Sequence, residues 1–304
     1  MKVDVPYSRL QTFYHVAINK SFKKAARNLS VTEGAISQQI KDLEGRLGRQ
    51  LFERSSRAVA LTPNGSNLLH LVAPIVEKVD SVVDEFEEIT GSLRGKVKIA
   101  SFEAMLLYVF PKYLEKFRKT YPECELLLFN VSGMQIRSMV LSGVVDFGVA
   151  SVEDLPSGIV GQEVWTYKRY FIAPKGHPLS KKRRLTLQDF AQYPLVMPDE
   201  AGAAGRFLVN VMESHNPNLQ VTVQAGGWQV VMKYVELGFG ISVLPGIALQ
   251  PKDKSRFYLR PLSDIGDALG YSRYGILLKK GKYLSPATRE LIRFFSPDFN
   301  FGNH

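Results

Sequence analysis

The sequence predicts a multidomain α+β protein in which a small helical domain, a long joining helix and a larger α/β region follow one another. Two short amphipathic helical patterns, separated by a tight turn, lie within residues 21–54. An apolar stripe at helical spacing runs from Leu68 to Ile89, and strand and helix signals alternate from Lys96 onward. With 304 residues, 45% of them hydrophobic, the chain is long enough for two or three globular units.

The first pattern is typical of a helix-turn-helix. Ser21 can cap its first helix, and Thr32 can cap a second helix that ends near Gly48. Ser30 and Val31 form the turn between them, with Val31 expected as an apolar plug. Because small side chains let two helices cross closely, a pair of alanines is expected at the crossing. The positions expected to be buried are Phe22, Ala25, Ala26, Leu29, Ala35, Ile36, Ile40, Leu43 and Leu47.

The second helix of this pattern presents polar side chains on its outward face. These outward positions are Glu33, Ser37, Gln38, Lys41 and Asp42. Short polar and amide groups at the start of such a helix can reach base edges in DNA, and basic residues just after it suit contacts to phosphates. The residues expected to bind DNA are therefore Thr32, Glu33, Ser37, Gln38, Lys41, Arg54 and Arg57. Periodicity alone leaves open an ordinary three-helix packing module with solvated charges.

The charge distribution favours nucleic-acid binding by the N-terminal part. The whole chain has a net charge of +10. Residues 1–66 hold 11 Lys and Arg against 5 Asp and Glu, whereas residues 67–91 hold 1 against 6. A phosphate-binding module needs such a basic excess. The basic run from Lys181 to Arg184 is more typical of a solvated loop than of a second nucleic-acid site.

The sequence carries no signature of an enzyme, a metal site or a membrane segment. Cys124 is the single cysteine, so we expect a buried structural thiol and no disulfide within the chain. The five histidines are scattered, and no phosphate-binding loop or nucleophile elbow is present. We therefore expect no catalysis, no metal and no cofactor. No signal core or run of 18 apolar residues occurs, which predicts a soluble, cytoplasmic protein.

The segment after the helix-turn-helix has the pattern of one long amphipathic helix. Thr62 and Pro63 suit its N-terminus, and the stripe of 22 residues corresponds to roughly 33 Å of helix. The apolar positions are Leu68, Leu69, Val72, Ile75, Val76, Val79, Val82, Val83, Phe86 and Ile89. A partner helix from a second chain is expected to cover this stripe, with the acidic face pointing to solvent. The alternative is a helix packed on its own domain. Gly91 and Gly95 mark the expected hinge.

Residues over about 60 positions resemble, at fixed spacing, the N-terminal domain of LysR-type transcriptional regulators. They are Leu10, Phe13, Ala17, Ser21, Phe22, Ala25, Ala26, Leu29, Ser37, Ile40, Leu43, Glu44, Leu47, Gly48, Leu51, Phe52, Arg54, Leu61, Thr62 and Gly65. The resemblance implies a winged helix-turn-helix over residues 1–65 and a dimerising linker helix over residues 66–91. Glu33 and Gly34 depart from the residues common in the family. Glu33 could accept a hydrogen bond from a cytosine amino group or could repel phosphate.

From Lys96 onward, the alternating signals predict parallel sheets covered by helices. Strands are expected at 97–100, 125–130, 146–150, 170–173, 195–197, 220–224, 240–244 and 275–278, and helices at 106–119, 134–142, 187–190, 206–214, 228–237 and 286–295. The region resembles the effector-binding domain of the same family through Gly143, Asp146-Phe147-Gly148-Val149-Ala150, Gly176-His177-Pro178-Leu179, Val235, Gly238, Gly240-Ile241 and Leu244-Pro245. The resemblance implies a domain over residues 92–304 with two α/β subdomains, as in periplasmic binding proteins. Subdomain I is expected at about 96–165 and 268–304, and subdomain II at about 166–267.

Ligands in such folds lie beyond the carboxyl ends of strands, so four loops are expected to line a cleft. The loops are 101–104, 131–135, 150–152 and 199–205. The resemblance places effector contacts on Ser101, Glu103, Ser151 and Ala203. Trp228 could stack on a ligand or could simply lie in a core or a surface groove. The residues expected to bind an effector are thus Ser101, Phe102, Glu103, Ser151, Ala203 and Trp228.

Residues 163–165 and 234–235 resemble the branch of the family that regulates cysteine biosynthesis and sulfur use. In that branch, the positions matching Glu103 and Ala203 usually carry hydroxyls that bind an anion. Here Glu103 brings a negative charge and Ala203 has no donor, so a neutral or amine-bearing metabolite is expected rather than an oxyanion. Glu103 could instead sit at a helix N-terminus, where a carboxylate is stabilised by roughly 0.3–1 kcal/mol.

These inferences predict a transcriptional regulator that binds promoter DNA and a small-molecule effector, as a homodimer through the linker and a homotetramer through the sensor domains. A solute-binding protein or a small enzyme on a two-subdomain scaffold is the alternative from another class, and it would leave residues 1–90 unexplained. An architectural DNA binder would not need a sensor region of about 200 residues.

Overall fold

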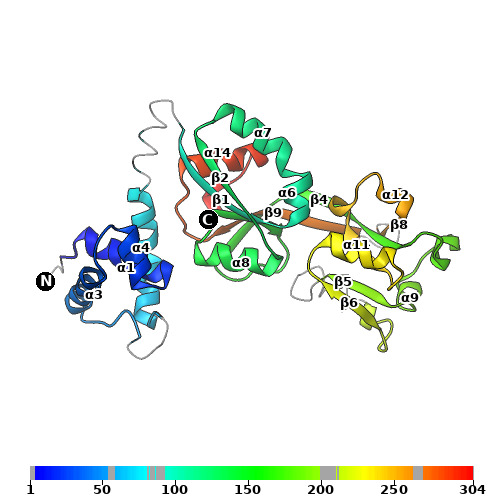
Figure 1. Cartoon of the computed structure of the whole chain (residues 1–304), viewed down its shortest axis with the longest axis horizontal. Helices are drawn as coiled ribbons and strands as arrows, with labels where there is room; N and C mark the ends of the chain where they lie inside the picture. Colours follow the sequence, from blue (N-terminus) through cyan, green and yellow to red (C-terminus); the bar gives the residue numbers. More distant parts are fainter. Residues whose placement is uncertain are drawn as a thin grey trace. The chain divides into compact units, whose positions relative to one another are not determined.

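The computed structural model describes residues 4–53, 59–80, 82, 86, 93–198, 210, 212–262 and 270–303. The chain forms two compact units. The first is Met1–Arg94 with Ser142–Val144 and Gly281–Arg289, and the second is Gly95–Leu141, Val145–Lys280 and Glu290–His304. Figure 1 labels the helices and strands of both units.

The N-terminal unit is built on α1 (Tyr7–Asn19), α2 (Phe22–Asn28), α3 (Glu33–Leu47) and α4 (Pro63–Asp80). The two predicted caps are confirmed. Ser21 Oγ accepts a hydrogen bond from Lys24 N, and Thr32 Oγ1 accepts one from Ala35 N, both at 3.2 Å. The paired alanines are buried in the core where α1, α2 and α3 meet, together with Phe13, Val16, Ala17, Ile36, Ile40, Leu43, Leu51 and Phe52.

The turn between α2 and α3 differs from the prediction. Val31 is 41% exposed, so its expected role as an apolar plug is wrong. Leu29 packs against the core instead. Ser30 adopts a φ of 55°, in the left-handed region, and this reverses the chain so that Val31 N donates to Ala26 O at 3.0 Å. The backbone conformation of Ser30 therefore determines the turn, and the side chain of Val31 is exposed rather than packed in the core.

After α3 ends at the left-handed Gly48, the chain forms a short antiparallel pair. Phe52 and Leu61 are bridge partners, and Glu53 N donates to Ala60 O at 2.9 Å. This pair has the form expected for the base of a wing. Arg54 and Arg57, which the sequence places between its two sides, lie outside the described residues.

Helix α4 begins as the sequence predicts. Thr62 Oγ1 accepts a hydrogen bond from Gly65 N at 3.0 Å, and Pro63 occupies the first turn. A Cβ atom at Gly65 would lie 2.1 Å from Leu51 O, so only glycine fits here. Pro74 lies inside α4, which the apolar pattern alone did not indicate. Proline has no amide hydrogen, so it cannot donate a hydrogen bond to the preceding turn.

The strands of the C-terminal unit are β1 (Gly95–Ser101), β2 (Cys124–Asn130), β3 (Phe147–Ser151), β4 (Ile159–Pro174), β5 (Leu195–Pro198), β6 (Val221–Ala225), β7 (Ser242–Pro245), β8 (Phe257–Pro261) and β9 (Tyr271–Lys279). The larger sheet has the order β2-β1-β3-β9-β4-β7, with β8 also paired to β4, and β5 pairs with β6. β1 runs parallel to β2 and β3, and β5 to β6, whereas the pairings of β4 and β9 are antiparallel. The prediction of parallel sheets is therefore only partly right.

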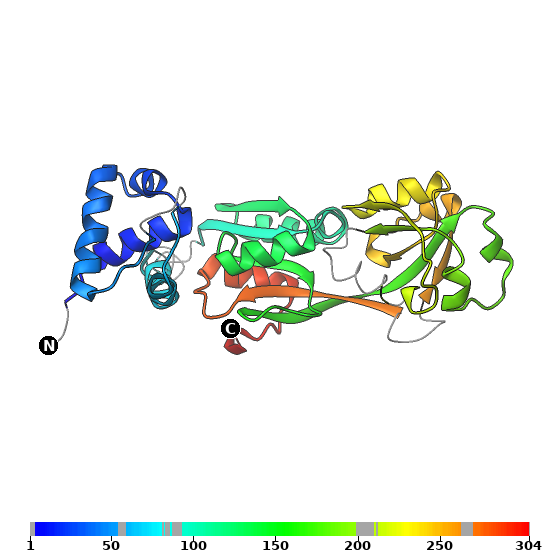
Figure 2. The same cartoon turned by 90° about the horizontal axis from the view of Figure 1, so that it is seen from below.

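β4 and β9 are much longer than the predicted strands 170–173 and 275–278, and they explain the antiparallel pairing. Residues 159–168 of β4 pair with β9, and residues 169–174 pair with β7 and β8. The chain thus leaves the region of β1–β3 along β4 and returns along β9, which Figure 2 shows as a long orange strand. We call the region of β1–β3 subdomain I and the region of β5–β8 subdomain II.

The helices of this unit are α6 (Glu103–Tyr108), α7 (Phe110–Thr120), α8 (Gly133–Ser142), α9 (Leu187–Phe190), α11 (Trp228–Glu236), α12 (Asp253–Arg256) and α14 (Pro286–Phe295). The single helix predicted at 106–119 is two helices, because Pro111 lies in the first turn of α7 and cannot donate a backbone hydrogen bond. β8 and α12 have no counterpart in the predicted elements. The predicted helix 206–214 falls largely outside the described residues.

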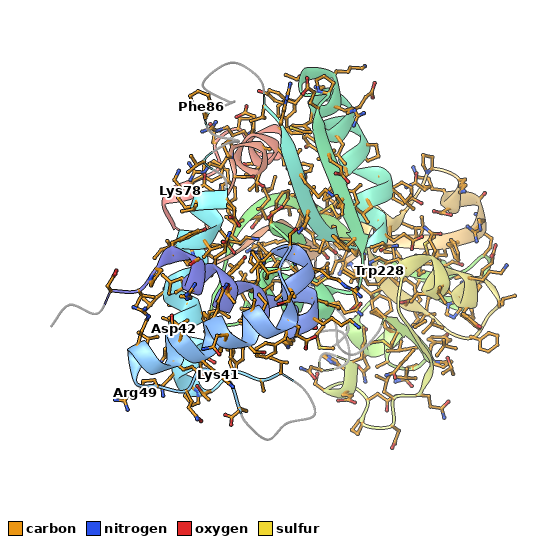
Figure 3. All side chains as sticks on the ribbon, turned by 60° about the vertical axis from the view of Figure 1, so that its left-hand side comes forward. Lys41, Asp42, Arg49, Lys78, Phe86 and Trp228 are labelled. Atoms are coloured by element: carbon orange, nitrogen blue, oxygen red, sulfur yellow. The ribbon has the colours of Figure 1, made fainter. Side chains whose placement is uncertain are left out.

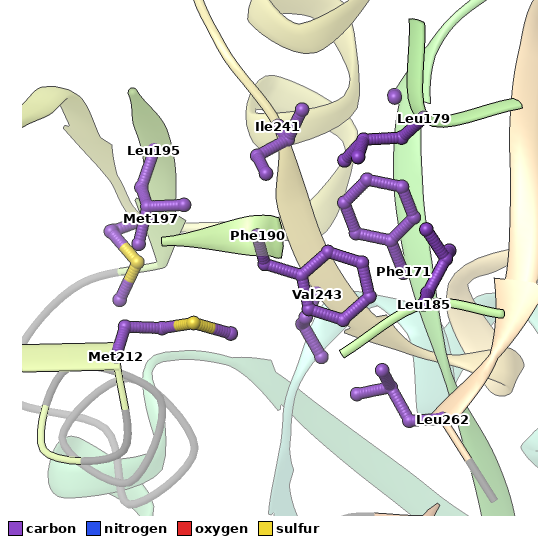
Figure 4. Packing of buried hydrophobic residues seen from close by; sticks show 11 residues of the cluster. Phe171, Leu179, Leu185, Phe190, Leu195, Met197, Met212, Ile241, Val243 and Leu262 are labelled. Carbon is purple, nitrogen blue, oxygen red and sulfur yellow. The ribbon is translucent and has the colours of Figure 1, made fainter. Parts of the chain in front are cut away.

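Subdomain II has its own hydrophobic core beside the end of β4. The rings of Phe171 and Phe190 stack with centroids 4.3 Å apart, and Figure 4 shows Met197, Met212 and Leu262 around them. In subdomain I, Cys124 is 1% exposed, as expected for a structural thiol. No helix in the described part of the chain is long and apolar enough to cross a membrane.

Candidate nucleic-acid interface and effector site

The outward face of α3 carries most of the predicted DNA-binding residues. Glu33, Gln38 and Lys41 are exposed, and Ser37 is half-buried at its edge. Thr32 is exposed as well, but its hydroxyl already caps the helix. Figure 3 shows Lys41 on the outer side of this helix. The cap thus holds the first turn of α3 in place, and the amide and ammonium groups that follow remain open to a partner.

Asp42 was expected on the same outward face, but its carboxylate forms hydrogen bonds within the protein. Its Oδ2 accepts hydrogen bonds from Arg9 Nε at 3.0 Å and from Arg46 Nε at 3.1 Å. The hydrogen bond from Arg9, followed by that from Arg46, lowers the pKa of the Asp42 carboxyl. Asp42 therefore ties α3 to α1. The outward polar face is narrower than the sequence pattern suggested.

Other exposed cations lie on α2 and just after α3, and they were not among the predicted residues. Arg49 follows α3 and lies on the same side as Lys41 in Figure 3. Lys23, Lys24 and Arg27 are exposed on α2. A basic excess in residues 1–66 was visible in the sequence, but which of its members reach the surface depends on how α2 and α3 pack.

Helix α4 has an uncovered apolar face in addition to the one packed on its own unit. Val72 and Val76 are buried, and Leu68 and Leu69 pack against the N-terminal core. The uncovered residues are Leu71, Ile75 and Val79 on α4, with Val82 and Phe86 further along the chain, and each is more than 40% exposed. Ile75 and Val82, like Val79 and Phe86, are seven residues apart, which is the spacing of a coiled-coil seam. We refer to these five residues as the α4 seam. Val83 and Ile89 of the predicted stripe lie outside the described residues.

The acidic side of α4 is not wholly turned to solvent. Glu77 is half-buried, and its Oε1 accepts a hydrogen bond from Tyr14 OH at 3.0 Å. Asp80 is exposed, as expected, whereas residues 84, 85, 87 and 88 lie outside the described residues. Glu77 therefore helps to hold α4 on α1, a role that its position on a charged helix face did not reveal.

The carboxyl ends of three strands of subdomain I meet at one edge of the sheet. Ser101 of β1 is the register partner of Asn130 in β2 and of Val149 in β3. The Ser101 side chain is fully buried, and its Oγ donates to Val149 O at 2.9 Å. Ser151 Oγ accepts a hydrogen bond from Glu153 N at 3.3 Å. Both predicted ligand hydroxyls are therefore already engaged within the protein.

Beyond this edge, the start of α6 lies close to the start of α11. A Cβ atom built on Gly227 would lie 3.7 Å from Glu103 Oε2, and Trp228 is the first residue of α11. One turn further along α6, Tyr108 OH accepts a hydrogen bond from Gln229 Nε2 at 3.4 Å. We call this region the α6–α11 junction. It brings Glu103 and the start of α11 together across more than 120 residues of sequence, and Ala203 lies outside the described residues.

The remaining predicted residues are anchored in the protein. The ring of Phe102 lies 5.1 Å from that of Tyr274 on β9, and Trp228 is half-buried against the core that includes Ile172 and Val231. Glu103 is the first residue of α6 and lies in its first turn. This position agrees with the alternative explanation for Glu103, because a helix N-terminus favours a negative charge.

Next to Tyr274 lies a polar cluster that the sequence did not reveal. Arg169 is buried at the point where β4 changes partners, and its Nε donates to Ser272 Oγ at 2.8 Å. Arg169 Nη2 lies 3.6 Å from Glu153 Oε2. Burial raises the pKa of the Tyr274 hydroxyl to about 12. Because Arg169 stands in the run Tyr-Lys-Arg-Tyr-Phe, nothing in the local pattern distinguishes it from its exposed neighbour Lys168.

Two family models match the chain. The model described as bacterial regulatory helix-turn-helix protein, lysR family, matches residues 7–66, and the LysR substrate binding domain matches residues 90–299. HTH-type transcriptional regulator CysB of Burkholderia cenocepacia is 27% identical over 293 residues, which cover 95% of this chain and 92% of that protein. HTH-type transcriptional regulator SsuR of the same species is 27% identical over 284 residues, or 93% of this chain and 91% of that protein.

Among solved structures, a full-length OxyR variant from Pseudomonas aeruginosa matches with a TM-score of 0.75 at 19% sequence identity. The match covers 96% of this chain and 95% of that chain, so the fold is shared over nearly the whole length.

Proposed function

Since this chain belongs to the LysR family of DNA-binding transcriptional regulators, we propose that it reads promoter DNA through α3 and senses a metabolite at the α6–α11 junction. Regulators of this family bind promoter DNA and small-molecule effectors and form oligomers. The chain is a regulator and not an enzyme, which removes the alternative of a small enzyme or solute-binding protein on the same scaffold. Its place of action would be the bacterial cytoplasm, where the DNA lies.

The capped, outward face of α3 is the observation that supports the DNA-reading role. Gln38 and Lys41 are exposed on it, while Asp42 is turned back to Arg9 and Arg46. We assign base contacts to Gln38, Ser37 and Glu33, and phosphate contacts to Lys41, Arg54 and Arg57, with Thr32 as the cap that positions them. A gel shift with promoter DNA at several salt concentrations tests this assignment. Binding that does not weaken with salt would contradict it.

We propose that residues 1–65, 66–91 and 92–304 act as DNA-binding domain, dimerising linker and effector domain, and that two chains pair through the α4 seam. The uncovered residues of the seam follow a heptad spacing, and a second copy of the same helix has a matching face. Pairing would place two recognition helices for two half-sites. Light scattering of an Ile75→Glu, Val79→Glu variant tests the pairing. An assembly with the same molecular mass as that of the unsubstituted protein would contradict it.

A tetramer through the effector domains is the larger assembly that we propose. β2 is an edge strand with β1 as its neighbour, and Leu128 on it is exposed. Such an edge offers apolar surface and backbone groups to another copy. Sedimentation of the protein with the α4 seam disrupted should then show residual dimers, and monomers alone would contradict a second interface.

For the effector, we propose a small neutral or amine-bearing metabolite. The carboxylate of Glu103 lies beside Gly227 at the start of α11. A carboxylate there attracts an amine and repels an oxyanion. Thermal-shift screening tests this class: sulfate or thiosulfate that stabilised the protein strongly, and lost the effect in Glu103→Arg, would contradict it.

Binding at the junction would act on DNA through β4 and β9, which connect subdomains I and II. A ligand that favours one arrangement of the subdomains shifts the population toward it. In a dimer or tetramer, this would change the angle between paired DNA-binding domains and so the bend of the promoter. DNase footprints should therefore change in extent or spacing with effector. Identical footprints would exclude this mechanism.

A further inference from the structure

A pocket of about 650 Å³ lies in subdomain II and contains none of the residues predicted to bind the effector. Its walls come from the end of β4, from β8 and from the turns that follow or precede them. Ligand pockets in proteins commonly have volumes of 300–1,000 Å³, so this one has room for a small organic molecule. The residues that define its chemistry are Tyr170, Lys175, Ser180, Lys254, Phe257 and Leu259.

The pocket has an apolar floor. Phe257 is buried, and Tyr170 and Leu259 pack beside it in the hydrophobic cluster of subdomain II that includes Ile172 and Val235. This floor is made by rigid elements, because Tyr170 on β4 and Pro261 on β8 are register partners in the same sheet. A ligand with a flat or branched apolar body could displace water from such a surface.

The rim of the pocket is cationic. Lys175 and Lys254 are exposed, and Lys175 Nζ donates to Lys254 O at 3.3 Å, which joins the turn after β4 to α12. Among the residues that the structure describes, no Asp or Glu lines the pocket. In the part of the chain that the structure describes, neither lysine forms an ion pair with a carboxylate.

The carboxylates of Asp253 and Glu236 form ion pairs with Arg256 rather than with the pocket lysines. Asp253, the neighbour of Lys254, is buried and pairs with Arg256 Nη1 at 3.0 Å. Glu236 accepts hydrogen bonds from Arg256 Nε at 2.9 Å and Nη2 at 2.8 Å. The positive charge of the two pocket lysines is therefore left for a partner from outside.

The motif Gly176-His177-Pro178-Leu179, which DNA binding does not explain, shapes one wall of this pocket. Gly176 has a φ of 82°, in the left-handed region. His177 Nδ1 accepts a hydrogen bond from Leu179 N at 3.3 Å. The centroid of the His177 ring lies 4.5 Å from that of the Tyr193 ring. These contacts hold the short turn Pro178–Lys181, which carries Ser180 to the rim of the pocket.

We propose that this pocket binds a second small molecule, an organic anion with an apolar body, such as an aryl carboxylate or an aryl phosphate. The two ammonium groups take the anionic group, and Tyr170, Phe257 and Leu259 take the body. Trp228 of the α6–α11 junction packs in the same hydrophobic cluster as this floor. A ligand in the pocket would thus affect the packing of Trp228 at the start of α11.

Isothermal titration of the full chain with benzoate and with phenyl phosphate tests the proposal, and the two probes separate carboxylate from phosphate. We expect at least one to bind, and Lys175→Glu and Lys254→Glu each to weaken it about tenfold or more, which corresponds to 1.4 kcal/mol. Lys252→Glu, an exposed neighbour outside the pocket, and Glu103→Gln, at the proposed effector site, should leave the affinity within about twofold.

A second variant tests the space rather than the charge. Ser180→Trp places a large ring at the rim and should abolish binding without altering the thermal transition. The proposal is overturned if neither probe binds, if Lys252→Glu weakens binding as much as Lys175→Glu, or if inorganic phosphate competes as well as phenyl phosphate. It is also overturned if the lysine variants reduce affinity for DNA while probe binding stays unchanged, since the lysines would then serve nucleic acid.

Discussion

The outward face of α3 and the α6–α11 junction differ in how their polar side chains are used. On α3, Gln38 and Lys41 remain exposed, and one helix displays them both. At the edge of subdomain I, the hydroxyls of Ser101 and Ser151 are engaged within the protein. The junction itself joins segments far apart in the chain. The proposed DNA reading would therefore depend on one helix, whereas the proposed ligand sensing would depend on how distant elements pack.

The largest effect is expected where the N-terminal unit has no room for a side chain. Gly65→Ala would drive a Cβ into Leu51 O, and we expect the unit to lose about 3 kcal/mol of stability and its affinity for DNA. Gly45→Ala is the matched control, because nothing lies within 4 Å of that position on α3, and it should stabilise the helix by about 1 kcal/mol. Calorimetry separates the two cases. Equal transitions in both variants would show that Gly65 is not constrained.

In the C-terminal unit, the sharpest loss is expected at the buried Arg169. Arg169→Ala removes the hydrogen bond to Ser272 and the charge beside Glu153, and should cost about 2–3 kcal/mol of unfolding free energy. Lys168→Ala, exposed on the same strand, should change it by less than about 0.5 kcal/mol. If urea titration gave the same midpoint for both variants, the cluster at Ser272 would be dispensable.

On α3, single substitutions should separate base reading from phosphate binding. Gln38→Ala should remove about 1–3 kcal/mol of discrimination at one base pair and relax sequence preference there. Arg54→Ala should weaken binding to all sequences alike and reduce the dependence on salt by about one phosphate contact. Competition gel shifts with mutated promoters measure both effects. A uniform loss of affinity in Gln38→Ala would mean that Gln38 does not read a base.

The smallest effect concerns pH and the contact of α1 with α4. Burial lowers the pKa of His15 and outweighs the opposite influence of Asp80. The folded unit then binds a proton less readily than the unfolded chain, so its stability is complete above the ordinary pKa of 6.5 and falls as the pH drops below it. His15→Gln should flatten this dependence of the thermal midpoint, whereas His70→Gln, at an exposed position, should not. A steeper loss in His15→Gln would reverse the assigned sign.

Local signals in the sequence were enough for the helix-turn-helix. Both caps depend on residues three positions apart, and the buried face of α3 follows from periodicity alone. Val31 was misplaced because the conformation of Ser30, and not hydrophobicity, decides where that side chain points. Asp42 was misread because Arg9, its partner, lies 33 residues earlier.

The C-terminal unit was harder to predict because its decisive contacts are long-range. The sequence indicated only short parts of β4 and β9, since the pairing of Ile159 with Lys279 that extends them joins distant segments. The cluster around Arg169 has the same origin, with Ser272 103 residues away. Glu103 was correctly placed near the start of α6, but its approach to Gly227 follows only from the fold.

The late position of β9 in the sequence also determines the order in which parts of the chain can fold during biosynthesis. β3 is translated more than 100 residues before its neighbour β9. Because a chain grows by about 5–20 residues per second, roughly 6–24 s pass before β9 is available to pair with β3. Helices α1–α4, which all precede residue 81, can fold during this interval. A nascent chain would therefore acquire α3, the helix proposed to read DNA, well before β9 completes the larger sheet. Ribosome-bound chains arrested before residue 271 should expose the edge of β3 that later pairs with β9, and chaperones could bind there.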